Sequence, residues 1–118
     1  MIKEKIKVPI YNAGILLIIA DDFGSAMGDY AEEDYEKYFA VTIPTTPFNY
    51  IVGFEKEALC HMIVSHEACH LAHRIMNDAG LEHTLLNDEA EAYLQGYIVN
   101  EIYKVIKTNK LMCYEKQN

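Results

Sequence analysis

The spacing of apolar residues along the chain changes near residue 55. Before that point, short apolar runs alternate with turn residues, which predicts β-strands. The expected strands cover residues 6–11, 15–20, 39–43 and 50–54. Pro9 favours an edge position for the first of them, and Asn12 and Gly14 predict a turn after it. We expect the last two strands to form a hairpin.

After residue 55, apolar positions recur with helical spacing. A first helix is predicted from about Glu55 to Ala79, because Gly80 suits the left-handed position that ends a helix. Its apolar residues lie on most sides, which is typical of a helix in the middle of a domain. A second helix is predicted from about Asp88 to Lys107, and residues 108–118 form a polar tail.

These elements predict one α+β domain over residues 1–118. A chain of 118 residues, of which 51% are hydrophobic, is long enough to bury a core. We expect a small antiparallel sheet from residues 1–54, packed on the buried first helix and on the second helix of residues 55–107. The longest uncharged apolar run, residues 13–20, is too short to cross a membrane, so no membrane partner is expected.

The negative charge of the chain is concentrated in one segment. The formal net charge is −8, and seven acids fall within residues 21–36, where there is no Lys or Arg. The remainder carries ten basic residues against eleven acidic ones, so it is nearly neutral. Such a field repels a phosphate backbone, and we expect no nucleic-acid partner. The acidic segment 21–36 is either a solvated loop or a contact surface for a protein partner.

The three cysteines do not form a disulfide framework. Their number is odd and their spacing is irregular, at Cys60, Cys69 and Cys113. We therefore expect reduced thiols in a cytoplasmic protein.

The most informative residues lie inside the first helix, where His66-Glu67-Ala68-Cys69-His70 forms an HExxH motif. A chain of this composition contains that motif by chance only about 0.02 times. Residues four apart lie on one helical face, so His66 and His70 can hold one metal ion. Glu67 then lies beside the ion and can act as general base. The alternative interpretation is two hydrogen-bonded core histidines with a surface glutamate.

Catalytic zinc needs a third protein ligand and an open position. The candidates are Asp88, Glu89, Glu91, His73, His83 and Cys69. Glu89 is the best of them, because it opens the second helix. Ala92 and Gly96 follow on its face and let that helix approach closely. His83, in the connection between the helices, is an alternative third ligand.

The order His66-Glu67-x-x-His70 followed by Glu89-x-x-Ala92 resembles the gluzincin pattern. It is similar to the ImmA/IrrE-like metallopeptidases and to short HExxH proteins encoded by phages and prophages, over roughly residues 50–105. The resemblance implies a zincin-like fold in which His66, His70 and Glu89 bind Zn²⁺. Tyr93 stands where such sequences often have an Asp or Asn that supports a ligand, and its hydroxyl could take that role. Candidates for stabilising an oxyanion are Tyr93, Tyr97 and His73.

Two functions are consistent with these residues. The first is a zinc-dependent peptidase that hydrolyses a peptide or protein substrate, which could pair with the strand at residues 50–54. The second is a non-catalytic, phage-encoded interaction protein, stabilised by zinc, that binds a host protein through the acidic segment.

Overall fold

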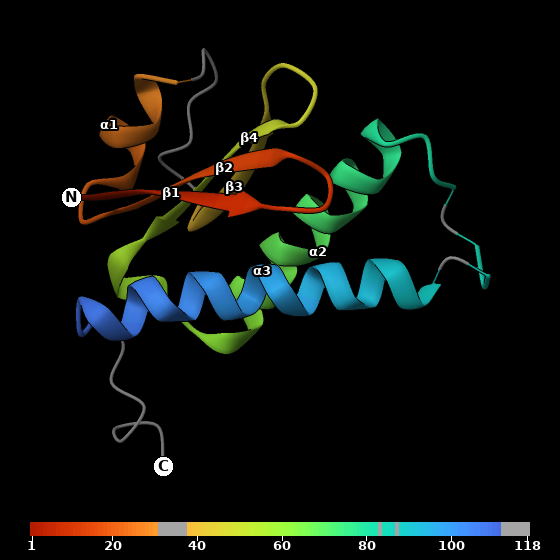
Figure 1. Cartoon of the computed structure of the whole chain (residues 1–118). Helices are drawn as coiled ribbons and strands as arrows, with labels where there is room; N and C mark the ends of the chain where they lie inside the picture. The colour runs from red at the N-terminus through yellow and green to blue at the C-terminus, as the bar shows by residue number, and fades with distance from the viewer. Residues whose placement is uncertain (31–37, 83, 87, 112–118) are drawn as a thin grey trace.

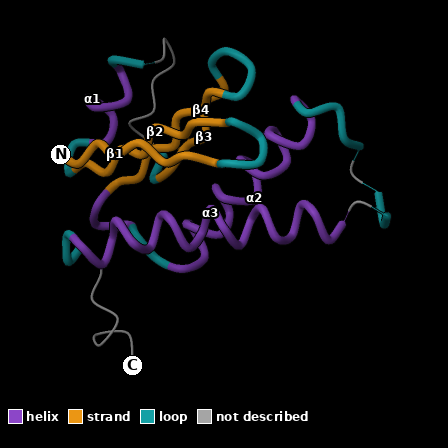
Figure 2. The backbone as a smooth tube through the Cα atoms, viewed as in Figure 1, coloured by secondary structure: helices purple, strands orange, loops and turns teal. Residues whose placement is uncertain are grey.

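The computed structural model describes residues 1–30, 38–82, 84–86 and 88–111. They form three layers, in which a four-stranded sheet lies between one short helix and two long helices (Figure 1; Figure 2). In chain order the elements are β1 (Ile2–Val8), β2 (Ala13–Ala20), α1 (Phe23–Gly28), β3 (Ala40–Pro44), β4 (Asn49–Glu55), the short 3₁₀ turn η1 (Lys56–Ala58), α2 (His61–Asp78) and α3 (Asp88–Thr108). The expected α+β class is confirmed.

The sheet is mixed, so the expectation of a wholly antiparallel sheet is wrong. The strand order is β1-β2-β4-β3, with antiparallel pairs at both sides and a parallel β2–β4 pair in the centre. The reason is the crossover after β2, which runs through α1 before the chain re-enters the sheet. β3 and β4 do form the expected hairpin, but β3 takes the outer edge and β4 lies beside β2.

The central strand β2 is apolar on both faces because both are covered. Ile15, Leu17 and Ile19 belong to the core shared with α2 and α3. The alternate residues Ile18 and Ala20 belong to a second core beneath α1. This two-sided burial explains a continuous aliphatic run in place of an apolar–polar alternation.

The short helix α1 was missed by the sequence pattern. It is six residues long and lies at the start of the acidic segment, among two glycines that argue against a helix. Asp22 caps it, because the Ser25 backbone N–H donates to the Asp22 carboxylate at 3.2 Å. One of the acids in this segment is therefore structural.

The HExxH helix α2 is buried along one side only. It begins at His61 and not near Glu55, because Glu55 completes β4 and η1 follows. Its buried residues include Val64, Leu71 and Ile75, whereas the opposite side is exposed. The expectation of a helix in the middle of the domain is thus wrong. α2 lies at the surface, against the sheet and α3.

Several expectations fall outside the described residues. The sequence also predicts a short helix over residues 30–38, and most of it lies outside the described residues. So do four acids of the acidic segment (Glu32, Glu33, Asp34 and Glu36), the alternative ligand His83, Cys113 and most of the polar tail. In the ranges that the structure does describe, no helix is both long enough and apolar enough to cross a membrane.

Gly53 allows α1 to pack closely on β4. A Cβ atom at this position would lie 2.4 Å from Met27 Sδ and 3.1 Å from Phe23 Cε1. Both side chains are buried and have little room to move. We expect Gly53→Ala to lower the free energy of unfolding by about 1–3 kcal/mol, measured by urea denaturation.

Gly96→Ala is the matched control for this substitution. Gly96 lies on the exposed side of α3, and a Cβ there meets nothing within 4 Å. The control should raise the free energy of unfolding by about 0.5–1 kcal/mol. Equal gains in both variants would contradict close packing at Gly53.

Candidate metal and catalytic site

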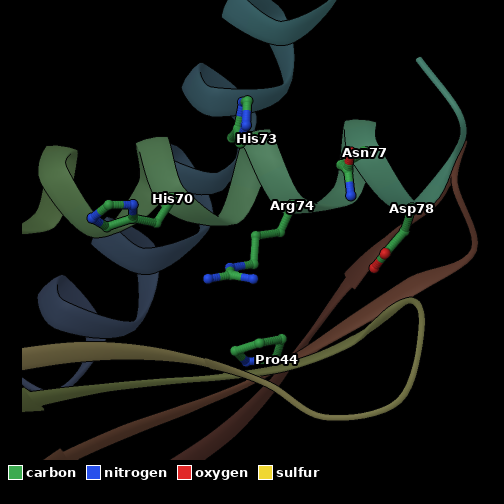
Figure 3. Close-up of a pocket in the computed structure, with 6 residues that line it drawn as sticks. All are labelled: Pro44, His70, His73, Arg74, Asn77 and Asp78. Atoms are coloured by element: carbon green, nitrogen blue, oxygen red, sulfur yellow. The ribbon is translucent and has the colours of Figure 1, made fainter. Parts of the chain in front are cut away.

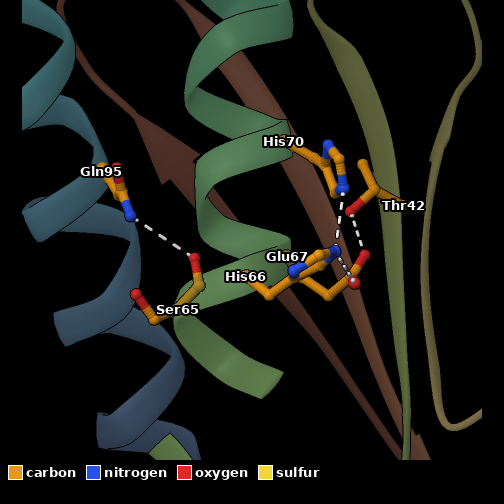
Figure 4. Close-up of polar contacts among 6 residues, drawn as sticks. All are labelled: Thr42, Ser65, His66, Glu67, His70 and Gln95. Atoms are coloured by element: carbon orange, nitrogen blue, oxygen red, sulfur yellow. Dashed lines mark hydrogen bonds and ion pairs between the residues drawn. The ribbon is translucent and has the colours of Figure 1, made fainter. Parts of the chain in front are cut away.

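The two imidazoles of the HExxH motif converge beside β3 (Figure 4). Their Nε2 atoms lie 3.2 Å apart, and both side chains are exposed. Two nitrogens that each lie about 2.0–2.1 Å from one tetrahedral zinc ion are about 3.3 Å from each other. The observed separation therefore fits a shared Zn²⁺. It also fits an Nε2–H···Nε2 hydrogen bond between a donor and an acceptor ring.

Glu67 is held in place by β3. Its side chain is only 8% exposed, and the Thr42 hydroxyl donates to its Oε1 atom at 2.7 Å. The other oxygen, Oε2, lies 4.0 Å from His66 Nε2. The alternative of core histidines with a surface glutamate is wrong, because the imidazoles are exposed and the carboxylate is buried.

His66, Glu67 and His70 form the one cluster of at least three potential ligands found among the described residues. Their ligand atoms all lie within 4.8 Å of one another. A buried carboxylate is costly unless it is paired, and a cation between the imidazoles would lie close to it. The donor set of imidazole and carboxylate suits zinc among other divalent ions.

A groove runs between α2 and β3 and passes this cluster. Phe39, Met62 and Ile63 line one end of it, next to His66 and Glu67. The middle is lined by both imidazoles, Glu67, Thr42 and Arg74. The other end is lined by Pro44, His70, His73, Arg74, Asn77 and Asp78 (Figure 3). We call these residues together the α2–β3 groove. One of its ends is apolar and the other is polar.

Glu89 is not brought to the imidazoles. It lies exposed in the first turn of α3, outside the cluster of potential ligands. The buried side of α3 begins at Glu91, and two residues along a helix turn the side chain by about 200°, so Glu89 faces away. Ala92 and Gly96 are exposed too, so the expected close approach through them is wrong. The assignment of Glu89 as third ligand stays a prediction.

The glutamate that α3 turns toward α2 is Glu91. Its Oε1 atom lies 3.5 Å from Nδ1 of His73, which points to the α3 side of the helix (Figure 3). His73 also lines the groove next to His70. Tyr93 is 76% exposed and lines a separate hollow beside the turn after β1. Its role, like that of His73, as support for the site stays a prediction.

Sequence reasoning missed Thr42 and Arg74. Thr42 lies in the predicted strand 39–43, but its pairing with Glu67 depends on how α2 crosses β3. Arg74 could have been found, because it follows His70 by four residues and so lies on the same helical face as the imidazole pair.

Asp78 fixes the polar end of the groove to the sheet. The Tyr50 hydroxyl and the Phe48 backbone N–H both donate to its Oδ2 atom. Burial of the phenol, followed by its hydrogen bond to Asp78, raises the pKa of Tyr50 well above its ordinary value. These bonds join the last turn of α2 to the start of β4.

Comparisons with known proteins give no family for this chain. No protein-family model matches it, and no curated protein or solved structure does either. The resemblance to gluzincins therefore stays a prediction.

We expect Tyr50→Phe to lower the free energy of unfolding by about 1–3 kcal/mol at pH 7, because the hydrogen bond from the buried phenol to the Asp78 carboxylate is lost. A phenol whose pKa is raised on folding stabilises the protein fully below the unfolded pKa of about 10 and progressively less above it. The difference between wild type and Tyr50→Phe should therefore shrink at pH 11, measured by chemical denaturation.

Tyr97→Phe is the control for this pH dependence. Its hydroxyl donates to the Lys7 backbone carbonyl at 2.8 Å in an exposed position. Any change in the difference between wild type and this variant from pH 7 to pH 11 is subtracted from the change found for Tyr50→Phe. If the stability differences of the two variants change equally with pH, folding does not raise the pKa of Tyr50.

Zinc binding tests the imidazole pair directly. We expect His66→Ala and His70→Ala each to weaken zinc affinity by more than about 100-fold, since losing a group that only supports a ligand already costs 10–100-fold. His61→Ala is the control, because that imidazole contacts Tyr103 at the start of α2. Competition with a zinc-chelating dye measures all three. Equal affinities would show that the HExxH imidazoles do not bind zinc.

Proposed function

We propose that the chain is a zinc-dependent metallopeptidase. The observation that carries the proposal is the juxtaposition of two imidazole nitrogens 3.2 Å apart with a buried carboxylate held by Thr42. This combination supplies a metal-binding pair and a proton acceptor at one point of an open groove. We place the activity in the cytoplasm, on the irregular cysteine spacing and on the free thiols of Cys60 and Cys69.

The residues have separate tasks in this proposal. His66 and His70 hold the ion, and a bound Zn²⁺ supplies Lewis-acid chemistry to a water molecule and to the scissile carbonyl. Glu67 accepts a proton from the attacking water and passes it to the leaving amine. Thr42 fixes one oxygen of Glu67 by its hydrogen bond, which leaves the other oxygen available for the proton. Water molecules would complete the coordination, because Glu89 faces away from the imidazoles.

The groove suits an extended peptide. In the described part of the chain, β3 pairs with β4 on one side and has no strand on the other, so its outer edge can add a strand. The strand at residues 50–54 cannot take this role, because β4 lies between β2 and β3. A peptide on the edge of β3 passes the residue pair Thr42–Glu67, where the proton transfer takes place.

A non-catalytic interaction protein is the second candidate. Ile10 and Tyr93, which are 89% and 76% exposed, line one apolar hollow at the surface, and an exposed apolar patch often contacts a partner. In this alternative the metal would stabilise α2 and the protein would act only by binding. Of the acidic segment 21–36 first considered for such binding, only residues 21–30 are described.

Glu67→Gln separates the two candidates. The amide keeps the shape of the side chain and can still accept the Thr42 hydrogen bond, but it cannot take a proton. We expect peptide hydrolysis by the zinc-loaded protein to fall by about 10²–10⁴-fold. Zinc affinity should fall far less, because both imidazoles remain. Cleavage of a mixed peptide library, followed by mass spectrometry, measures this.

Glu57→Gln is the matched control, because Glu57 is exposed in η1 and lies outside the groove. It should leave hydrolysis unchanged. If Glu67→Gln and wild type cleave the library equally, or if neither cleaves it with zinc bound, the peptidase proposal fails and the interaction protein is favoured.

A further inference from the structure

The only arginine of the chain lies in the α2–β3 groove, next to the imidazole pair. Arg74 follows His70 by one turn of α2, about 6 Å along the helix axis. It lines both the middle of the groove and its polar end. Figure 3 shows its side chain extending from α2 toward Pro44, the last residue of β3, while His73 points to the other side of the helix.

Asp78 is the natural partner for this guanidinium, since it follows on the same face four residues later. It is engaged elsewhere, because its carboxylate accepts hydrogen bonds from Tyr50 and from the Phe48 backbone. Within the described ranges, no hydrogen bond or ion pair joins Arg74 to another residue. Five donors in a planar fork are thus exposed in the groove, beside the candidate metal site.

We propose that Arg74 is a carboxylate-binding residue that selects peptides with a negative charge one position or more from the scissile bond. This inference rests on the proposed peptidase function and names the substrate class of the same site. A guanidinium matches a carboxylate with two parallel N–H···O bonds. The opposite end of the groove, at Phe39, Met62 and Ile63, is apolar and accepts an uncharged side chain.

The carboxylate has two possible sources, and the direction of the peptide decides between them. β3 and α2 run the same way, from Ala40 beside Met62 to Pro44 beside Arg74. A peptide antiparallel to β3 brings residues on the amino side of the scissile bond to Arg74, so the ligand is an Asp or Glu side chain. A parallel peptide brings its carboxyl end there, so the ligand is the terminal carboxylate.

The single arginine makes the test direct, because the protein has only one arginine Nε–Hε signal in a ¹⁵N-correlation NMR spectrum. Three probes are titrated: N-acetylglycine with a terminal carboxylate, N-acetylaspartate α-amide with a side-chain carboxylate, and the neutral N-acetylasparagine amide. Each titration is made with zinc-free and zinc-loaded protein, because a carboxylate on zinc could otherwise imitate one on Arg74.

We expect at least one carboxylate probe to shift the Arg74 signal, with saturation, in both the zinc-free and the zinc-loaded protein. At equal concentration, the neutral probe should shift the signal at least tenfold less. The stronger of the two carboxylate probes identifies the source. Arg74→Gln should lower the affinity for that probe at least tenfold, measured through the backbone amide signals of α2. Lys110→Gln removes the same charge at an exposed residue two positions after the end of α3, and it should have no effect.

The inference is overturned if no probe moves the Arg74 signal, if the neutral probe binds as tightly, or if Arg74→Gln leaves affinity unchanged. These outcomes are separate from failure of the peptidase proposal. If the peptidase proposal fails, the zinc-loaded protein hydrolyses no peptide. Carboxylate binding to the zinc-free protein would still show that Arg74 forms an anion-binding site. If charged and uncharged peptides are hydrolysed equally well and Glu67 is required for both, the protein is a peptidase without specificity for carboxylates.

Discussion

The hydrogen bond from Thr42 to Glu67 joins the HExxH helix to the edge of the sheet, and the site depends on it. This contact covers the carboxylate of Glu67, which is buried although α2 lies at the surface of the molecule. The imidazoles of His66 and His70 stay exposed. A buried carboxylate needs compensation, and one hydroxyl donor gives only part of it. A cation between His66 and His70 would provide the remainder, so a bound metal would help to hold Glu67 in its position.

The position of α2 follows from the way the two cores are built. β2 and β4 are covered on both faces, so the sheet can present only its outer strands to solvent. α2 lies on one face near β3 and leaves a groove between helix and edge strand. The bonds from Tyr50 and Phe48 to Asp78 fix the far end of the helix to the sheet. The groove is therefore formed by α2 and β3 within this one fold.

Much of this arrangement could be predicted from local sequence patterns. Branched apolar runs located β2 and β4, and the helical spacing of HExxH placed the imidazoles on one face. The parallel β2–β4 pair could not be predicted, because strand direction depends on a crossover whose helix α1 is short and rich in glycine. The prediction of which face of α3 contacts α2 was also wrong. Small residues at Ala92 and Gly96 suggested a close helix contact, whereas the larger apolar stripe from Leu94 to Ile106 decides the packing. Thr42 could not be assigned from sequence, since its partner lies 25 residues away.

The central claim is that His66 and His70 share one zinc ion beside Glu67. X-ray absorption spectroscopy at the zinc edge of the protein, loaded with one equivalent of zinc, tests this most directly. The account predicts scattering from two imidazole rings at about 2.0–2.1 Å, with oxygen atoms completing the shell. A shell containing sulfur at about 2.3 Å, or one without imidazole scattering, would contradict it.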